Sequence, residues 1–295
     1  FEGEPVDRVA PMHYQGQILG VSGSWVRLSW VNGLPEGMIR IGHQLLLIDY
    51  DPMLGELLAT ELLDEHAELD QRPPDSPVSS AALSENLKVL PLSIVLDTLY
   101  NEAHDGLGLE RALTIVNAVD GLYQEQLGLR LELRTVRLLI DPGADPMRRL
   151  SGDIDELLNV FRRFRLGDVT IARGQGAVHL FSGAKLADKR VGLAYIDTIC
   201  RSDGYDVGVS RVVDRDVFTF AHELAHNLGA EHDLDTQCGD DGRMMNATLR
   251  SDMQYAFSAC SVKSIRRGMQ RTCVLDQPAL QFAAAGLDEA DSVVD

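Results

Sequence analysis

Apolar and polar positions alternate along residues 13–50, between residues that favour turns. Alternation with a period of two is typical of strands with one buried face. It predicts strands at residues 14–20, 24–30 and 43–49. Residues 55–70 are acidic and are predicted to be helical. The pattern therefore predicts a small β-rich unit near the start of the chain.

The pattern changes from Leu87 onward, where strand-like and helix-like segments follow one another. Apolar residues at helical spacing predict amphipathic helices at residues 107–126, 154–164 and 217–228. Short apolar or alternating runs predict strands at residues 89–97, 129–133, 168–172, 177–182 and 190–196. This mixture predicts a domain of the α/β (α+β) class.

A stretch rich in proline and serine separates the two regions and has no apolar periodicity. Such composition is typical of a linker. We therefore divide the chain into a β-rich region at 1–72, a linker at 73–86, a larger domain at 87–275 and an acidic tail at 276–295.

The charge of the chain excludes some partners. Its 295 residues contain 27 Lys and Arg against 45 Asp and Glu, a formal net charge of -18. Because this charge repels phosphate backbones and anionic lipids, we expect no nucleic-acid partner and no membrane partner. The chain also lacks an apolar run of about 18 residues, the length that spans a bilayer.

The four cysteines all lie in the last third of the chain, at Cys200, Cys238, Cys260 and Cys273. An even number in one region indicates two disulfides and therefore an oxidising location, which is secreted, extracellular or periplasmic. Four free thiols of a cytosolic protein are the alternative. No two cysteines have the Cys-x-x-Cys spacing, which argues against a zinc ribbon or a thioredoxin-type site.

The predicted helix at 217–228 carries the candidate chemistry. His222 and His226 are four residues apart, so both imidazoles project from one face and can bind one ion. Glu223 lies at the rim of that face, where it can reach a metal-bound water. Gly229 lets the backbone leave the helix, which brings His232 back as a third nitrogen ligand. Three neutral nitrogens and an open fourth position are typical of catalytic zinc.

This extended motif resembles that of the metzincin metalloproteases, which also have a methionine-containing turn after the third histidine. Within that clan the chain resembles the adamalysin/reprolysin family, the catalytic domains of ADAMs and snake-venom metalloproteinases. Asp233 follows the third histidine, as in that family. Three further segments match its pattern, at residues 177–183, 191–195 and 257–261. The distance to Phe257 selects Met245, rather than Met244, as the methionine of the turn.

The resemblance implies a zinc-dependent endopeptidase with a twisted, mixed five-stranded sheet and an active-site helix. His222, His226 and His232 would bind one Zn²⁺, and Glu223 would act as general base and acid. Met245 would pack beneath the site without binding the metal. Protein or peptide substrates would pair, as an added strand, with an edge strand that includes Gly192, Leu193 and Ala194.

The resemblance also implies a specificity pocket walled by residues after Met245, and the disulfide pairs Cys200–Cys273 and Cys238–Cys260. Two further expectations come from positions at which this chain departs from the patterns of related metzincins. Ala247 stands where other metzincin families place a tyrosine ligand, so no fourth protein ligand is expected. Pro91 and Leu92 occupy the region where venom enzymes have an acidic calcium ligand, so we do not expect a calcium site.

The β-rich region at 1–72 resembles the prodomain of the same family, and a generic small β module is the alternative. A latent proenzyme, with this region covering the cleft, is the corresponding prediction. No cysteine precedes Cys200, so a cysteine cannot be the residue that silences the zinc. Two other functional interpretations stay open, a catalytically silent binding module with the same fold and a metzincin of another family.

Overall fold

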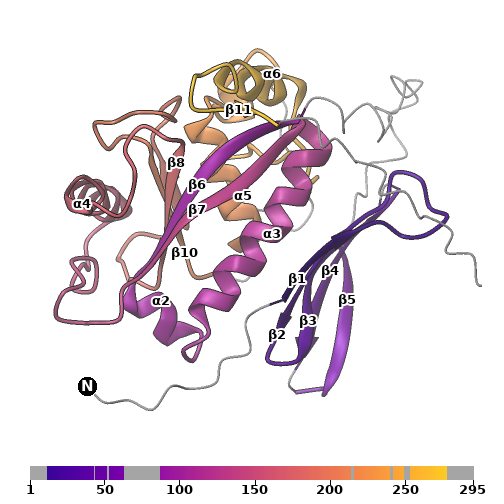
Figure 1. Cartoon of the computed structure of the whole chain (residues 1–295), viewed down its shortest axis with the longest axis horizontal. Helices are drawn as coiled ribbons and strands as arrows, with labels where there is room; N and C mark the ends of the chain where they lie inside the picture. The colour runs from indigo at the N-terminus through magenta and orange to yellow at the C-terminus, as the bar shows by residue number, and fades with distance from the viewer. Residues whose placement is uncertain are drawn as a thin grey trace, which may run out of the picture.

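The computed structural model describes residues 12–42, 44–51, 53–62, 87–213, 216–239, 242–248 and 253–277, and Figure 1 shows their arrangement. The predicted linker at 73–86 and nearly all of the predicted tail at 276–295 lie outside these residues. The described residues form two sheets and several helices. None of the described helices has the length and apolar character needed to cross a bilayer.

The first sheet is an antiparallel meander of five strands, which bears out the β-rich character predicted for this region. The strands follow one another in the order β1 (Met12–Gly16), β2 (Trp25–Val31), β3 (Leu34–Ile41), β4 (Gln44–Asp51) and β5 (Glu56–Leu62). Asn32 and Gly33 both have positive φ, as a tight hairpin turn requires. The prediction of a helix at 55–70 is wrong over β5, because these residues pair with β4 along their whole length.

The second sheet is mixed and, among the described residues, has five main strands, the number that the resemblance implies, and a sixth strand of two residues. They are β6 (Lys88–Leu96), β7 (Leu129–Leu138), β8 (Ala177–Ser182), β9 (Gly192–Ala194), β10 (Val207–Arg211) and β11 (Leu275–Asp276). β7, β6, β8 and β10 pair in parallel, in that order, and β9 adds antiparallel to β10. β9 therefore lies at one edge of the sheet. β11 pairs antiparallel with the start of β6.

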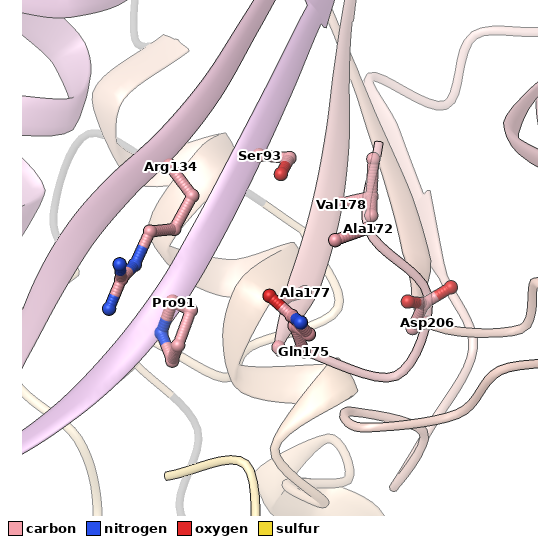
Figure 2. Close-up of a pocket in the computed structure, with 9 residues that line it drawn as sticks. Pro91, Ser93, Arg134, Ala172, Gln175, Ala177, Val178 and Asp206 are labelled. Atoms are coloured by element: carbon pink, nitrogen blue, oxygen red, sulfur yellow. The ribbon is translucent and has the colours of Figure 1, made fainter. Parts of the chain in front are cut away.

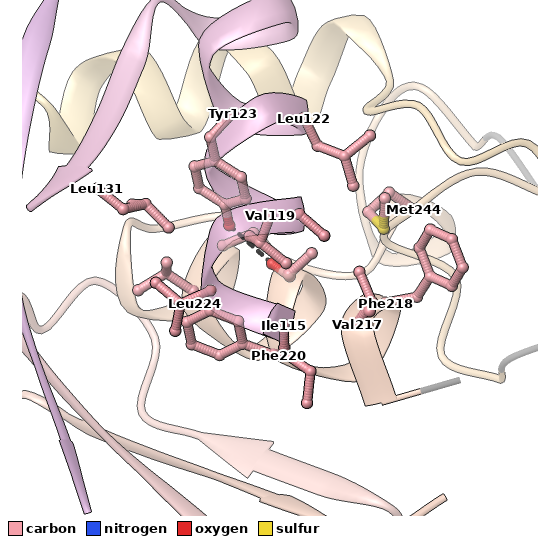
Figure 3. Packing of buried hydrophobic residues seen from close by; sticks show 14 of the residues in the cluster. Ile115, Val119, Leu122, Tyr123, Leu131, Val217, Phe218, Phe220, Leu224 and Met244 are labelled. Carbon is pink, nitrogen blue, oxygen red and sulfur yellow. Dashed lines mark hydrogen bonds between the residues drawn. The ribbon is translucent and has the colours of Figure 1, made fainter. Parts of the chain in front are cut away.

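Helices cover both faces of the second sheet (Figure 1). They are α2 (Thr98–Ala103), α3 (Gly108–Leu127), α4 (Ile154–Gly167), α5 (Asp216–Asn227) and α6 (Ala259–Gly268). α3, α5 and α6 form one core with every second residue of β6, from Leu90 to Leu96. On the other face, α4 forms a second core with β8 and β10. Figure 3 shows the packing of α3 on α5, where the Tyr123 hydroxyl donates to the Ala221 carbonyl at 2.7 Å.

In the second sheet two strand predictions fail and β10 was missed; in the first sheet β3 was missed, and the strand predicted at 14–20 ends at Gly16 in β1. Residues 168–172 form a turn instead of a strand, because the Asp168 carboxylate accepts from both the amide and the hydroxyl of Thr170. The strand predicted at 190–196 is reduced to the three residues of β9. β10, which lies between β8 and β9, was not predicted from its sequence.

The first sheet packs against the outer side of α3. Trp25, Met38, Leu45 and Leu62 share the core that α3 and α5 form. Gly121 of α3 permits this close approach, since a Cβ there would lie 2.9 Å from both the Trp25 ring and the Arg27 side chain. The buried Arg27 guanidinium also lies 3.4 Å from the Asp120 carboxylate.

Candidate active site

α5 brings two of the three predicted ligands together. All of its residues are buried, and the chain leaves it at Gly229, whose φ of 102° is unfavourable for other residues. The amides of Gly229 and Ala230 donate back to the carbonyls of His226 and Ala225. This turn places His232 so that its Nε2 atom lies 3.3 Å from Nε2 of His226.

The hydrogen bonds of the histidines leave the right atoms free for a metal. Nδ1 of His222 lies 2.8 Å from the Met244 carbonyl, and Nδ1 of His226 lies 2.7 Å from the Ala230 carbonyl. Because a carbonyl only accepts, each Nδ1 carries a proton and each Nε2 presents a lone pair. Burial lowers the pKa of His222 to about 3 and of His226 to about 4, so both rings are neutral near neutral pH.

The donor set fits a zinc ion. One ligand atom from each of His222, His226 and His232 can be chosen so that all three lie within 4.8 Å of one another. Three imidazole nitrogens are a donor set of catalytic zinc sites. The carbonyls that hold the Nδ1 protons supply the outer contacts that usually orient such ligands.

Glu223 is buried beside these histidines, and burial raises its pKa to about 8. A Cβ built on Gly192 would lie only 2.4 Å from its Oε1 atom, so the backbone of β9 passes directly against this carboxylate. A carboxyl group with a raised pKa is suited to accept and release a proton near neutral pH. A bound dication nearby would favour its ionised form.

A cleft of about 750 Å³ opens above the histidines and Glu223. One wall contains all three residues of β9, Gly192, Leu193 and Ala194, as expected for a strand that pairs with substrate. Asn246, Ala247 and Thr248, which follow the predicted turn methionine, line the cleft as well. Lys189, Arg190 and Thr219 also line the cleft, and the sequence had not drawn attention to them.

The two methionines after the third histidine are both fully buried. The Met244 side chain belongs to the core cluster of α3 and α5 (Figure 3), and its carbonyl accepts from His222. The Met245 carbonyl accepts from the amide of Asp233 at 3.0 Å. The chain after α5 is therefore tied to the methionine turn, and the assignment of Met245 beneath the metal stays a prediction.

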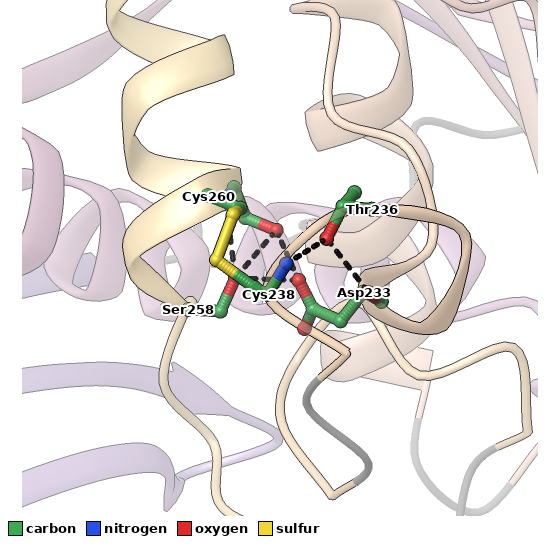
Figure 4. The surroundings of a disulfide bond; sticks show 6 residues. Asp233, Thr236, Cys238, Ser258 and Cys260 are labelled. Carbon is green, nitrogen blue, oxygen red and sulfur yellow. Dashed lines mark hydrogen bonds between the residues drawn. A yellow bond between two sulfur atoms is a disulfide. The ribbon is translucent and has the colours of Figure 1, made fainter.

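Asp233 and a disulfide fix the same region to α6 (Figure 4). The buried Asp233 carboxylate accepts from the hydroxyls of Ser258 and Ser261 at the start of α6. A disulfide joins Cys238 to Cys260 beside these contacts, and a second one joins Cys200 to Cys273. These are the pairs that the resemblance implies.

Two smaller cavities lie elsewhere. One of about 10 Å³, shown in Figure 2, lies between β6 and β8 and includes Asp206, whose carboxylate forms a fully buried ion pair with Arg165 at 2.9 Å. It has room for about one water molecule. The other, of about 240 Å³, lies between β1, α3 and β7. Neither contains a residue of the histidine cleft.

Comparison with known proteins decides the family. Residues 88–278 match the family model described as "Reprolysin (M12B) family zinc metalloprotease". The chain belongs to the reprolysin family. The reprolysin match begins at β6, at the same place where the sequence pattern changes to alternating strands and helices.

Three curated relatives of this reprolysin chain are metalloproteinases by name. Snake venom metalloproteinase fibrolase of Macrovipera lebetinus is 35% identical over 129 residues, which cover 41% of this chain and 63% of that protein. Disintegrin and metalloproteinase domain-containing protein 33 of Homo sapiens is 26% identical over 301 residues, which cover 90% of this chain and 36% of that protein. Zinc metalloproteinase-disintegrin-like brevilysin H2a of Gloydius brevicauda is 27% identical over 202 residues, which cover 65% of this chain and 47% of that protein. The chain thus spans less than two thirds of each relative.

The described N-terminal strands pack on α3 and do not line the cleft, whereas the proenzyme prediction for residues 1–72 as a whole stays a prediction. We expected residues 1–72 to cover the cleft, but no described residue of β1–β5 lines it. The physical reason is that the apolar face of this sheet is committed to α3. The pattern of the N-terminal sequence shows that such a face exists, but not which surface it packs against.

Proposed function

We propose that this protein is a zinc-dependent endopeptidase that hydrolyses peptide bonds of proteins. The observation that carries the proposal is that three histidines and a buried glutamate line one cleft together with β9, whose outer edge pairs with no described strand. His222, His226 and His232 hold the zinc. The bound ion supplies Lewis acidity, which polarises the scissile carbonyl and lowers the pKa of water.

Glu223 moves the proton in this proposal. As general base it takes a proton from the attacking water, and it then delivers that proton to the leaving amine. Its burial keeps the carboxyl away from bulk water, and its raised pKa suits it for both steps.

The walls of the cleft bind an extended peptide. The free edge of β9 offers main-chain groups of Gly192, Leu193 and Ala194 for pairing with substrate. Ala247 and Thr248 also line the cleft and would contact a substrate side chain. The two disulfides and the venom relative support a secreted location.

Replacing Glu223 by glutamine tests the proposal, with Glu132→Gln as a matched control. Glu132 lies on β7 and makes an ion pair with Arg134, away from the cleft. We expect Glu223→Gln to bind one zinc per chain and to lose about 10²–10⁴-fold of the peptidase activity, because a positioned acid/base is worth that much. Glu132→Gln should retain both properties.

A wild-type protein that binds zinc and cleaves no peptide from a library would support the silent binding module instead. Cleavage by Glu223→Gln at nearly the wild-type rate would show that the water is activated in another way.

We also propose that the chain is a proenzyme that is cut within residues 73–86. Because no cysteine precedes Cys200, latency would use steric cover or an oxygen or nitrogen ligand instead of a cysteine. A site for a specific protease, introduced within 73–86, allows the chain to be cut after it has folded. The first sheet is then present during folding and can pack against α3. We expect peptidase activity to rise on cutting. Equal activity before and after a complete cut would refute latency.

A further inference from the structure

Asn227, the last residue of α5, makes the contacts on which the inference rests. Its side chain is fully buried. Nδ2 lies 2.9 Å from the Tyr195 carbonyl and 3.0 Å from the Val207 carbonyl. Tyr195 directly follows β9, and Val207 begins β10. The amide of Asn227 therefore lies at the point where the edge strand and its neighbour separate.

The edge strand has little pairing of its own. β9 makes only three residue pairs with β10, from Gly192–Ser210 to Ala194–Gly208. The next main-chain contact, from the Tyr195 amide to the Val207 carbonyl, is long at 3.5 Å. Asn227 supplies a hydrogen-bond donor to both carbonyls where the strand ladder weakens.

The hydrogen bonds of Thr198 fix the orientation of the carboxamide. The Thr198 hydroxyl donates to the Tyr195 carbonyl at 2.8 Å, so it has only lone pairs left for Asn227, 3.3 Å away. Three oxygens thus surround one end of the Asn227 side chain, and that end must be the NH₂ group.

Main-chain hydrogen bonds also join the end of α5 to the loop that follows β9. The Asn227 carbonyl accepts from the amides of Thr198 and Ile199, at 2.9 and 3.2 Å, and the His226 carbonyl accepts from the amide of Asp197. The loop that leaves β9 therefore caps the last turn of α5, where the carbonyls have no partner within the helix itself. The histidine helix and the edge strand form one connected unit.

The opposite end of β9 meets the catalytic carboxylate, because Gly192 lies against Glu223. We propose that Asn227 is a positioning residue, which holds the substrate-pairing strand β9 at a fixed distance and register from the histidines and Glu223. This role rests on the proposed peptidase function. Asn227 itself contacts neither substrate nor metal in this proposal.

Asn227→Asp is the test variant, because it keeps the shape and replaces the NH₂ donor by an oxygen facing three oxygens. Asn117→Asp is the matched control, since Nδ2 of Asn117 donates to the Leu28 carbonyl at the contact between α3 and the first sheet. Thr198→Val is a second variant, which removes one hydroxyl from the network and leaves Asn227 in place.

The first measurement needs no activity. In the zinc-loaded full chain, we expect hydrogen exchange of the amides at 195–199 and 207–209 to rise about tenfold or more in Asn227→Asp, and to rise less in Thr198→Val. Zinc content and exchange in β6 and β7 should match the wild type, and Asn117→Asp should leave residues 195–199 unchanged. Unchanged exchange at 195–199 in folded Asn227→Asp would overturn the proposal. If that variant does not fold, Thr198→Val decides by the same criterion.

The second measurement separates positioning from a general structural role. For substrates long enough to pair with all of β9, kcat/KM should fall about tenfold in Asn227→Asp, whereas short substrates should lose less than about threefold. An equal loss for all lengths, with faster exchange in β6 and β7, would show a merely structural role. If the wild type cleaves nothing, the peptidase proposal fails, while the exchange measurement still decides whether Asn227 holds β9.

Discussion

Replacing Gly192 by alanine tests how closely the edge strand and the catalytic carboxylate must fit. A Cβ built on Gly192 lies 2.4 Å from Oε1, 2.7 Å from Cγ and 2.8 Å from Cδ of Glu223. Ordinary van der Waals contacts begin at 3.4 Å, so the strand or the carboxylate has to move by about 1 Å. Glu223 is buried and β9 is tied to α5 at its other end, so neither moves freely.

A displacement of that size is expected to lower kcat/KM by about 100-fold, since catalytic geometry tolerates little error. The free energy of unfolding should fall by about 1–3 kcal/mol, which is typical of an added methyl group in a packed site. The assay is cleavage of a fluorogenic peptide, together with zinc content and thermal unfolding. Gly167→Ala is the matched control, because a Cβ there meets no atom within 4 Å.

The reasoning is refuted if Gly192→Ala retains about half or more of the wild-type kcat/KM while folded and zinc-loaded, because the close contact would then be without consequence. A parallel loss of zinc content and of cooperative unfolding would show that the substitution damages the fold, and not only the position of Glu223.

Three further predictions concern metal, disulfides and pH. His226→Ala should abolish stoichiometric zinc binding, measured by metal analysis; full zinc content would contradict the ligand set. Removing the Cys238–Cys260 bond, which has a sequence separation of 22, should lower the free energy of unfolding in denaturant by about 3 kcal/mol. Removing the Cys200–Cys273 bond, which has a separation of 73, should lower it by about 4 kcal/mol. A smaller cost for the longer loop would contradict the chain-entropy reasoning. Burial lowers the pKa of His179 from 6.5 to about 3, so its neutral ring stabilises the fold above pH 6.5 and this contribution is lost as the pH falls toward 3. Between pH 7 and pH 4 the free energy of unfolding should therefore fall by about 3 kcal/mol more in wild type than in His179→Gln, and equal slopes would contradict this.

The sequence by itself determined the local part of this protein. The helices α3, α4 and α5 follow the apolar periodicity closely, because a long amphipathic stripe has one good way to be buried. The spacing of His222 and His226 on such a helix, with Gly229 after it, was enough to predict that three histidines meet. These features depend on residues that are near one another in the chain.

Features that depend on distant residues were not available from the pattern. β10 is a short run that becomes a strand because β8 and β9 pair with it on both sides. β5 was expected to be helical, but pairing with β4 overrides that local preference. The sequence likewise gave no sign of which surface the first sheet would cover.

The tertiary structure alone decided the fine geometry of the site. Asn227 stands next to His226 in the chain, yet its partners are carbonyls about 20 and 30 residues away, which no local rule connects to it. The sequence identifies Gly192 only as part of an edge strand, and the tertiary structure shows that the Glu223 carboxylate lies against its backbone. A side chain's type and spacing fix what chemistry it can perform, whereas long-range packing fixes the distances at which that chemistry takes place.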